Sequence, residues 1–220
     1  MRMRRRVNST TAFNLIELLL VIAAICIAIV LFLPMLGGSR KSPVVACMVN
    51  LKQIGVGFYL WAEDHAGRFP QEVSVDEKGT LEAIRTGSPA PHFQALNKYF
   101  RNWSILVCPT DKARRPGRTN TIVLADTNLS YFASVDATKS TTNALLSGDR
   151  HLTAAGQPGR PALLILTSNT VLSWTRELHK RSQRPGGNFL FVDGHVAWKQ
   201  SNLASVIRNQ GMTTNRVALP

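Results

Sequence analysis

The chain has 220 residues and a formal net charge of +13, with 45% hydrophobic and 18% charged residues. This composition excludes a chain that is disordered throughout, and the length allows one domain with a substantial core beside a membrane segment. The positive charge is typical of a soluble surface in general, and its alternative role is attraction to anionic lipid, polysaccharide or nucleic acid. The cations form no long run interleaved with aromatic residues, so direct nucleic-acid recognition is not indicated.

The first predicted element is an apolar run behind a basic leader. Four arginines lie within the first six residues, and the run from Leu18 to Leu36 is interrupted only by Pro34. Counted from Phe13, the segment has 24 residues, and about 20 helical residues suffice to cross a bilayer. The cations predict that the leader stays in the cytoplasm and that the rest of the chain lies outside the inner membrane.

Glu17 is the unusual residue of this run. A carboxylate inside a membrane span costs several kcal/mol and is retained mainly for a function. A cleaved signal peptide is disfavoured because the run is too long and ends at Leu36-Gly37-Gly38 without an Ala-x-Ala pattern. A plain membrane anchor would explain the length of the run but not its carboxylate.

The sequence from Ala12 through Phe13, Asn14 and Glu17 to Leu19 resembles the N-terminus of type IV prepilins and type II secretion pseudopilins. The resemblance implies that prepilin peptidase cleaves between Ala12 and Phe13 and that the new N-terminus of Phe13 is methylated. It also implies that Glu17 pairs with the N-terminal amine of a neighbouring subunit during assembly. The chain departs from the family pattern at Ala12, where Gly is preferred, and at Asn14, where Thr is usual.

Residues 37–67 are predicted to form an amphipathic continuation of this helix. Because Pro34 and Pro43 flank paired glycines, either the helix kinks and continues, or Ser42 caps a new helix with Pro43 at its first position. We expect the helix to stop near Gly67. Its apolar residues recur at spacings of three and four and should pack on a sheet; they are Val44, Cys47, Leu51, Ile54, Phe58 and Trp61.

Further motifs extend the resemblance to pseudopilin-like proteins of the Planctomycetes–Verrucomicrobia lineage. They are Asn50–Gly55, Trp61–Pro70, a Cys-Pro-Thr-Asp element at Cys108–Asp111, and Gly186–Val196. In these relatives the last motif belongs to a His-x9-Asp-Gly domain. The histidine at the corresponding distance is absent here, because position 183 is Gln183 and the nearest upstream histidine is His179.

Residues 68–220 are predicted to form a periplasmic α+β head. Strands are expected at 122–124, 130–135 and 162–166, and residues 114–120 are predicted to be an exposed basic loop. The expected fold is pilin-like: a long N-terminal helix, with 1–12 removed as a leader, 13–36 crossing the membrane and a kink between Pro34 and Pro43, packs on a C-terminal antiparallel sheet.

A terminal hairpin is predicted over residues 188–199. Asp193-Gly194 is a two-residue turn signal, and a two-residue loop pairs Phe189 with Trp198. Because side chains alternate along a strand, this register turns a large aromatic face toward the amphipathic helix.

The chemical groups give few specific signals. Cys47 and Cys108 would face an oxidising compartment, so they form either a disulfide or two small buried residues, while Cys26 lies in the membrane segment. The histidine spacings match no zinc signature. We therefore predict no metal, cofactor or enzymatic activity, although some members of the resembled family bind calcium. Residues 147–151 and 193–195 are interpreted as turns.

The leading hypothesis is a pseudopilin-like structural subunit in the inner membrane, with a cytoplasmic N-terminus and a periplasmic head. Its implied partners are prepilin peptidase, other pilin-like subunits that contact its N-terminal helix, and inner-membrane lipid. One alternative is a minor type IV or competence pilin that contacts DNA. Another is a membrane-anchored periplasmic binding module or enzyme.

Overall fold

The computed structural model describes residues 14–36, 42–117, 123–155, 163–176, 178–181, 184–200 and 203–220. It divides into two compact units, Met1–Lys41 and Ser42–Pro220. The predicted processing residues Ala12 and Phe13 lie outside the described residues.

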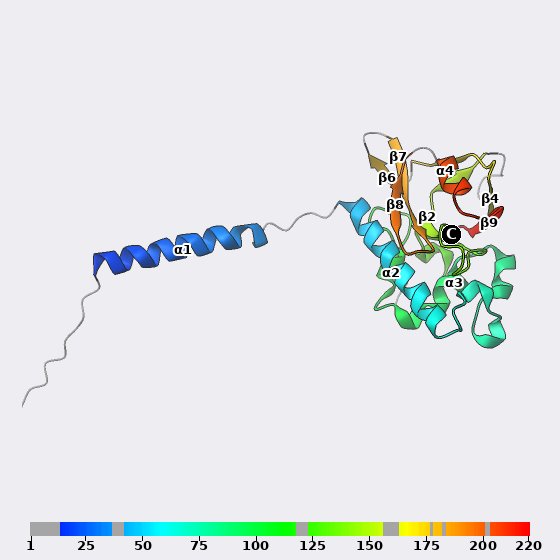
Figure 1. The fold of residues 1–220 in the computed structure, drawn as a ribbon, viewed down its shortest axis with the longest axis horizontal. Helices are drawn as coiled ribbons and strands as arrows, with labels where there is room; N and C mark the ends of the chain where they lie inside the picture. Colours follow the sequence, from blue (N-terminus) through cyan, green and yellow to red (C-terminus); the bar gives the residue numbers. More distant parts are fainter. Residues whose placement is uncertain are drawn as a thin grey trace, which may run out of the picture. The chain divides into compact units, whose positions relative to one another are not determined.

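The second unit combines helices and short strands (Figure 1). The α-helix described in the first unit is α1 (Leu15–Leu36), and those of the second unit are α2 (Pro43–Glu63), α3 (Ala90–Ala95) and α4 (Leu203–Arg208). The 3-10 helices are Pro70–Glu72, Val75–Glu77, Leu81–Thr86, Asn97–Tyr99, Trp103–Leu106 and Asp126–Asn128. The strands are β1 (Tyr131–Ser134), β2 (Leu145–Asp149), β3 (Leu152–Ala154), β4 (Leu163–Thr167), β5 (Leu172–Trp174), β6 (His179–Arg181), β7 (Arg184–Phe191), β8 (Val196–Lys199) and β9 (Thr214–Ala218).

Helix α1 is apolar around its whole circumference. Glu17, in its first turn, is its only charged residue, and the described side chains from Leu15 to Leu31 are exposed. At 1.5 Å per residue its 22 residues extend over about 33 Å, close to the hydrocarbon thickness of a bilayer. A helix without a polar face is typical of a membrane or of a buried interface.

Helix α2 begins at Pro43, with Ser42 as its N-cap. Of the two predicted alternatives, the new helix that begins at Pro43 is confirmed and the continuous long helix is wrong, because the described residues form two helices of 22 and 21 residues. Proline favours a helix start because it lacks an N–H group and disfavours helical geometry in the residue before it. After Glu63 the chain turns through Gly67, which has a φ of 78° and donates its N–H to the Ala62 carbonyl.

Two stretches of the described residues have the composition of a membrane segment. Pro43–Glu63 is long and apolar enough to span a bilayer, and Leu15–Leu31 is a shorter apolar stretch. The composition of α2 has another explanation, because one of its faces lies in the core of its own unit. The buried residues of that face are Cys47, Leu51, Ile54, Gly55, Gly57, Phe58, Trp61 and Ala62.

The sheet is antiparallel, so the fold class is α+β with an antiparallel sheet. Its strand order is β4-β9-β1-β2-β7-β6, with β8 also paired to β7, and β3 and β5 form a separate two-stranded sheet. In Figure 1, α2 runs alongside β7 and β8. Helix α4 packs near β4 and β5.

Side chains of the central strands alternate between two cores. Leu190 and Val192 belong to the core that contains the buried face of α2. Phe189 and Phe191 belong to a second core with β4, β5 and α4. This alternation is the two-residue period of a strand that is covered on both faces.

The predicted register of the terminal hairpin is wrong by one residue. The structure pairs Phe189 with Ala197, where Trp198 was expected. The loop has three residues because Gly194, with a φ of 85°, adopts the left-handed conformation and donates its N–H to the Phe191 carbonyl. One extra loop residue changes which residues of β8 share a face with Phe189 of β7. The predicted face toward α2 is also wrong, because Leu190 of β7 and Val192 just after it share the core with α2, while Phe189 and Phe191 lie in the other core.

Two other local predictions are also wrong. Residues 123 and 124, the described part of the strand predicted at 122–124, are not in a strand. Residues 147–149, predicted as a turn, lie in β2, which is buried along its whole length. A Ser-Gly-Asp sequence is typical of turns, but pairing on both sides with β1 and β7 forms a strand there.

Candidate functional site

The site is built around a disulfide that joins α2 to the loop after Trp103–Leu106. Cys47 and Cys108 are bonded, with Cα atoms 5.4 Å apart, and both residues are buried. Cys47 lies on the core face of α2, one turn before Leu51. The bridge fixes the Cys-Pro-Thr-Asp element against the first turns of the helix.

His179 lies directly against this disulfide. Its Nε2 atom is 3.4 Å from the Cys108 Sγ atom, and its Nδ1 atom is 3.3 Å from the Thr110 hydroxyl. Burial lowers the pKa of His179 to about 4, so the imidazole is neutral at physiological pH. His179 begins β6 and lies opposite Gly186 of β7. This pairing places His179 against Cys108, which is 71 positions away in the sequence.

Asp149 approaches the same nitrogen of this imidazole, Nε2, as the disulfide does. Its Oδ2 atom is 3.5 Å from His179 Nε2 and accepts hydrogen bonds from the backbone and side-chain nitrogens of Asn188. Complete burial raises the pKa of Asp149 to about 7 despite these hydrogen bonds. Because burial favours the neutral form of both groups, the contact between Asp149 and His179 is not an ion pair at neutral pH.

Arg150 follows Asp149 and forms a buried ion pair with Asp111. The Arg150 Nε atom lies 2.7 Å from Asp111 Oδ2, and its Nη2 atom lies 3.0 Å from Oδ1. Ser130 and the backbone N–H of Ala113 also donate to this carboxylate. Burial raises the pKa of Asp111, but these hydrogen bonds outweigh it and hold the pKa below its usual value.

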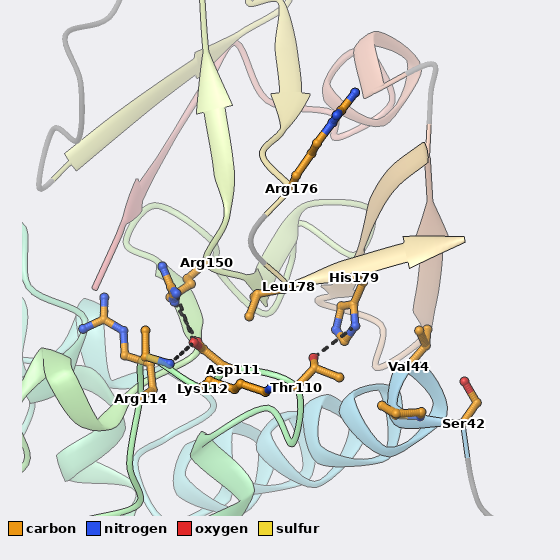
Figure 2. Close-up of a pocket in the computed structure, with 12 residues that line it drawn as sticks. Ser42, Val44, Thr110, Asp111, Lys112, Arg114, Arg150, Arg176, Leu178 and His179 are labelled. Carbon is orange, nitrogen blue, oxygen red and sulfur yellow. Dashed lines mark hydrogen bonds and ion pairs between the residues drawn. The ribbon is translucent and has the colours of Figure 1, made fainter. Parts of the chain in front are cut away.

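A cavity of about 920 Å³ opens above these residues. Figure 2 shows the Arg150–Asp111 pair and Thr110 along one wall, with Leu178 and His179 facing them. The N-terminus of α2 forms another part of the lining. Among the described residues of the lining, the cationic ones are Lys112, Arg114, Arg150 and Arg176, and the acidic one is Asp111.

The two cysteines and His179 are also the described residues closest to a metal-binding arrangement. One sulfur or nitrogen atom from each lies within 4.8 Å of the others. Metal ions bind thiolates, so this set could ligate a thiophilic metal only after the disulfide is reduced.

The remaining predicted residues lie elsewhere. Glu17 is in the first turn of α1, in the other unit, and Cys26 is an exposed free cysteine of that helix. Asp193 and His195 lie in the hairpin loop, where the Asp193 carboxylate contacts the His195 Nδ1 atom at 2.6 Å. Asp193 and His195 thus serve the turn and do not reach the cavity.

Asp111, Asp149, Arg150 and His179 all lie in segments singled out from the sequence, but no functional role was predicted for them. Asp149 and Arg150 were interpreted only as part of a turn, and the arginine partner of Asp111 is 39 positions away. Nothing in the local pattern links these residues, because the contacts form when β2, β6 and β7 assemble. Comparison of the chain with protein-family models, with curated proteins and with solved structures finds no match.

Proposed function

We propose that this protein is a pseudopilin-like structural subunit of a type II secretion machine or a related type IV pilus-like machine. In this role prepilin peptidase removes residues 1–12, α1 remains in the inner membrane, and the head lies in the periplasm. The observation that carries the proposal is Glu17, the only charge in an apolar helix of 22 residues.

The cost of placing a carboxylate in a bilayer is the physical argument. Insertion scales give about 3 kcal/mol for an acidic residue at the centre of a membrane helix, which is an upper bound for Glu17 in the first turn of α1. Helix α1 contains no cation to compensate it. The helix N-terminus favours a nearby negative charge by about 1 kcal/mol at exposed sites, so a cationic partner would stabilise the carboxylate further. The methylated amine of a neighbouring Phe13 would supply that charge.

Two features of the head support the same role. The Cys47–Cys108 disulfide suits a head exported into an oxidising compartment. The outward face of α2 also carries large exposed apolar side chains. Viewed along the helix axis, these side chains lie within an arc of about 60°, so they form one stripe. These side chains are Val45, Val49, Val56 and Leu60.

Replacing Glu17 by Ala tests the proposal. In the full chain, co-expressed as two differently tagged copies with its secretion machine, we expect Glu17→Ala to insert normally but to lose at least tenfold in cross-linked oligomers. Leu20→Ala, a truncation in the next turn of the same helix, is the matched control and should retain assembly. Unchanged cross-linking of Glu17→Ala would contradict the assembly role.

Processing is tested separately by mass spectrometry of the protein recovered from membranes. The expected N-terminus is a methylated Phe13. A chain that still begins at Met1 would exclude the peptidase step, whatever the outcome for Glu17.

The cavity favours a second candidate function, a membrane-anchored binding module. Its cationic lining has no evident role in a fibre built from α1 and α2. In this alternative, Glu17→Ala leaves ligand binding by the head unchanged.

A further inference from the structure

The cavity beside the disulfide has the charge of an anion-binding site. Among the described residues that line it, four are cationic and one is acidic, a formal charge of +3 for these residues, and His179 adds none because its pKa is lowered. Glu177, between Arg176 and Leu178, lies outside the described residues. Lys112 and Arg176 are exposed, so their charges are accessible to solvent. A concave surface of one sign concentrates ligands of the opposite sign.

Asp111, the carboxylate among the described lining residues, does not offset this preference. Both oxygens of Asp111 accept hydrogen bonds, from Arg150, from Ser130 and from the backbone N–H of Ala113. A carboxylate that is saturated in this way is poorly placed to bind a cation. It instead holds the Arg150 guanidinium in one orientation beside the cavity.

The start of α2 adds donors from a second side. Ser42, Pro43 and Val44 line the cavity, and the first N–H groups of a helix have no carbonyl partner within it. Pro43 is followed by Val44, Val45 and Ala46, so the first turn carries no acidic side chain. The positive end of a 21-residue helix therefore faces the same space as the cations.

The size of the cavity and its apolar residues limit the class of ligand. About 920 Å³ is within the range of small-molecule sites and far larger than a single anion requires. Leu178, Pro43 and Val44 provide apolar surface beside the charged groups. Donors on several sides suit a group with several acceptor oxygens, such as phosphate, better than a planar carboxylate.

We propose that this cavity binds an organic phosphate, with Lys112, Arg150 and the start of α2 around the phosphate group. Arg176 adds positive charge to the lining, although its guanidinium points away from these residues in Figure 2. The phosphate comes either from a soluble phosphate ester or from a phospholipid headgroup. The inference concerns Ser42–Pro220 only and does not depend on assembly through Glu17.

Calorimetric titration of the full chain in a non-ionic detergent tests the proposal. We expect glycerol 3-phosphate to bind and glycerol not to bind. The double variant Lys112→Gln/Arg176→Gln should raise the Kd at least tenfold. The matched control is Arg85→Gln/Arg101→Gln, which removes two exposed cations outside the lining and should leave the Kd within twofold. Equal unfolding midpoints for the variants and the native chain establish that the substitutions leave folding unchanged.

A second measurement separates the two sources of phosphate. With the full chain in lipid nanodiscs, a headgroup ligand slows hydrogen exchange of residues 110–114 in phosphatidylglycerol but not in phosphatidylcholine. A soluble ligand slows exchange only when glycerol 3-phosphate is added. The proposal is overturned if neither probe binds, or if the double variant binds as tightly as the native chain.

Discussion

Arg150 and Asp111 form an ion pair that stays charged at neutral pH. Among the described residues, it is the most completely buried pair of this kind. Their side chains are 4% and 1% exposed, and two parallel hydrogen bonds join them. A buried pair of this geometry adds little net stability compared with apolar residues, but removing one partner leaves an uncompensated charge. The structural role of Arg150 is therefore to keep the Asp111 loop in place below the cavity.

We expect Arg150→Gln to lower the free energy of unfolding by about 3–5 kcal/mol, because it leaves the Asp111 carboxylate buried without a cation. The control is Arg216→Gln, which breaks a pair of similar geometry with Asp136 that is 40% and 21% exposed. That control should cost about 0–1 kcal/mol, as exposed pairs do. Denaturant unfolding measures both values, and equal losses would show that burial does not set the role of Arg150.

The buried titratable groups predict how stability depends on pH. Burial lowers the pKa values of His92 and His179 to about 4, so stability falls as the pH drops from about 6.5 to 4. Asp149 has the opposite sign. Its folded pKa of about 7 lies above the unfolded value near 3.9, so its contribution is full at low pH and is lost as the pH rises through 7.

Removing the carboxyl of Asp149 should therefore expose the full effect of the histidines. Between pH 6.5 and 5, the unfolded state of the native chain binds about one proton more than the folded state, and we expect Asp149→Asn to raise this difference to about two. Each proton of difference makes the free energy of unfolding fall by about 1.4 kcal/mol for each unit by which the pH is lowered. Unfolding free energies at half-unit pH intervals measure the slope. Asp76→Asn, at an exposed carboxyl, should leave the slope unchanged, and the same result for Asp149→Asn would contradict burial as the cause.

At the scale of elements, repeated patterns were predictable and single-residue details were not. The buried face of α2 could be predicted because its apolar residues recur every three or four positions over four turns. Five of the six residues expected on that face are buried. The hairpin was also predictable, but its register depends on whether Gly194 makes a two-residue or a three-residue loop. Strand β2 was missed because its Ser-Gly-Asp sequence has turn propensity, and burial on both faces overrides that propensity.

Helix α2 also allows a test of the assembly surface. Val49 and Val56 are 45% and 57% exposed on its outward face. We expect Val49→Lys/Val56→Lys to reduce cross-linked oligomers of the full chain at least fivefold while leaving its unfolding midpoint unchanged. The new lysines stay hydrated in the single chain and would lose their water only if this face were buried against another subunit. Val75→Lys, at a valine that is 56% exposed outside α2, is the matched control. Normal assembly of the double variant would show that this face is free in the fibre.

For the whole molecule, the sequence predicted an apolar N-terminal helix followed by an α+β head, but not the arrangement of the site. The apolar run and the carboxylate at Glu17 are local signals that can be read directly. The cavity needs the start of α2, the loop at Asp111 and the segment before β6 to meet. Such long-range contacts leave no periodic pattern in the chain, so composition alone indicated only a basic head.

The division into two units leads to a final prediction. Both hydrophobic cores consist of residues after Ser42, so a chain of Ser42–Pro220 exported to the periplasm should fold without α1. We expect cooperative unfolding and no free thiol, because Cys47 and Cys108 are bonded and Cys26 is removed. Circular dichroism and thiol counting in denaturant test both points.

The same shortened chain measures the contribution of the disulfide. The bridge closes a loop of 61 residues, for which the loop-entropy relation gives about 4 kcal/mol of stabilisation. Cys47→Ala/Cys108→Ala should lower the free energy of unfolding by about that amount. Thr110→Val, which removes a hydroxyl beside His179, should lower it less because it leaves the bridge intact. If Ser42–Pro220 instead aggregates with both thiols free, folding of the head depends on the membrane helix, and the two units are not independent.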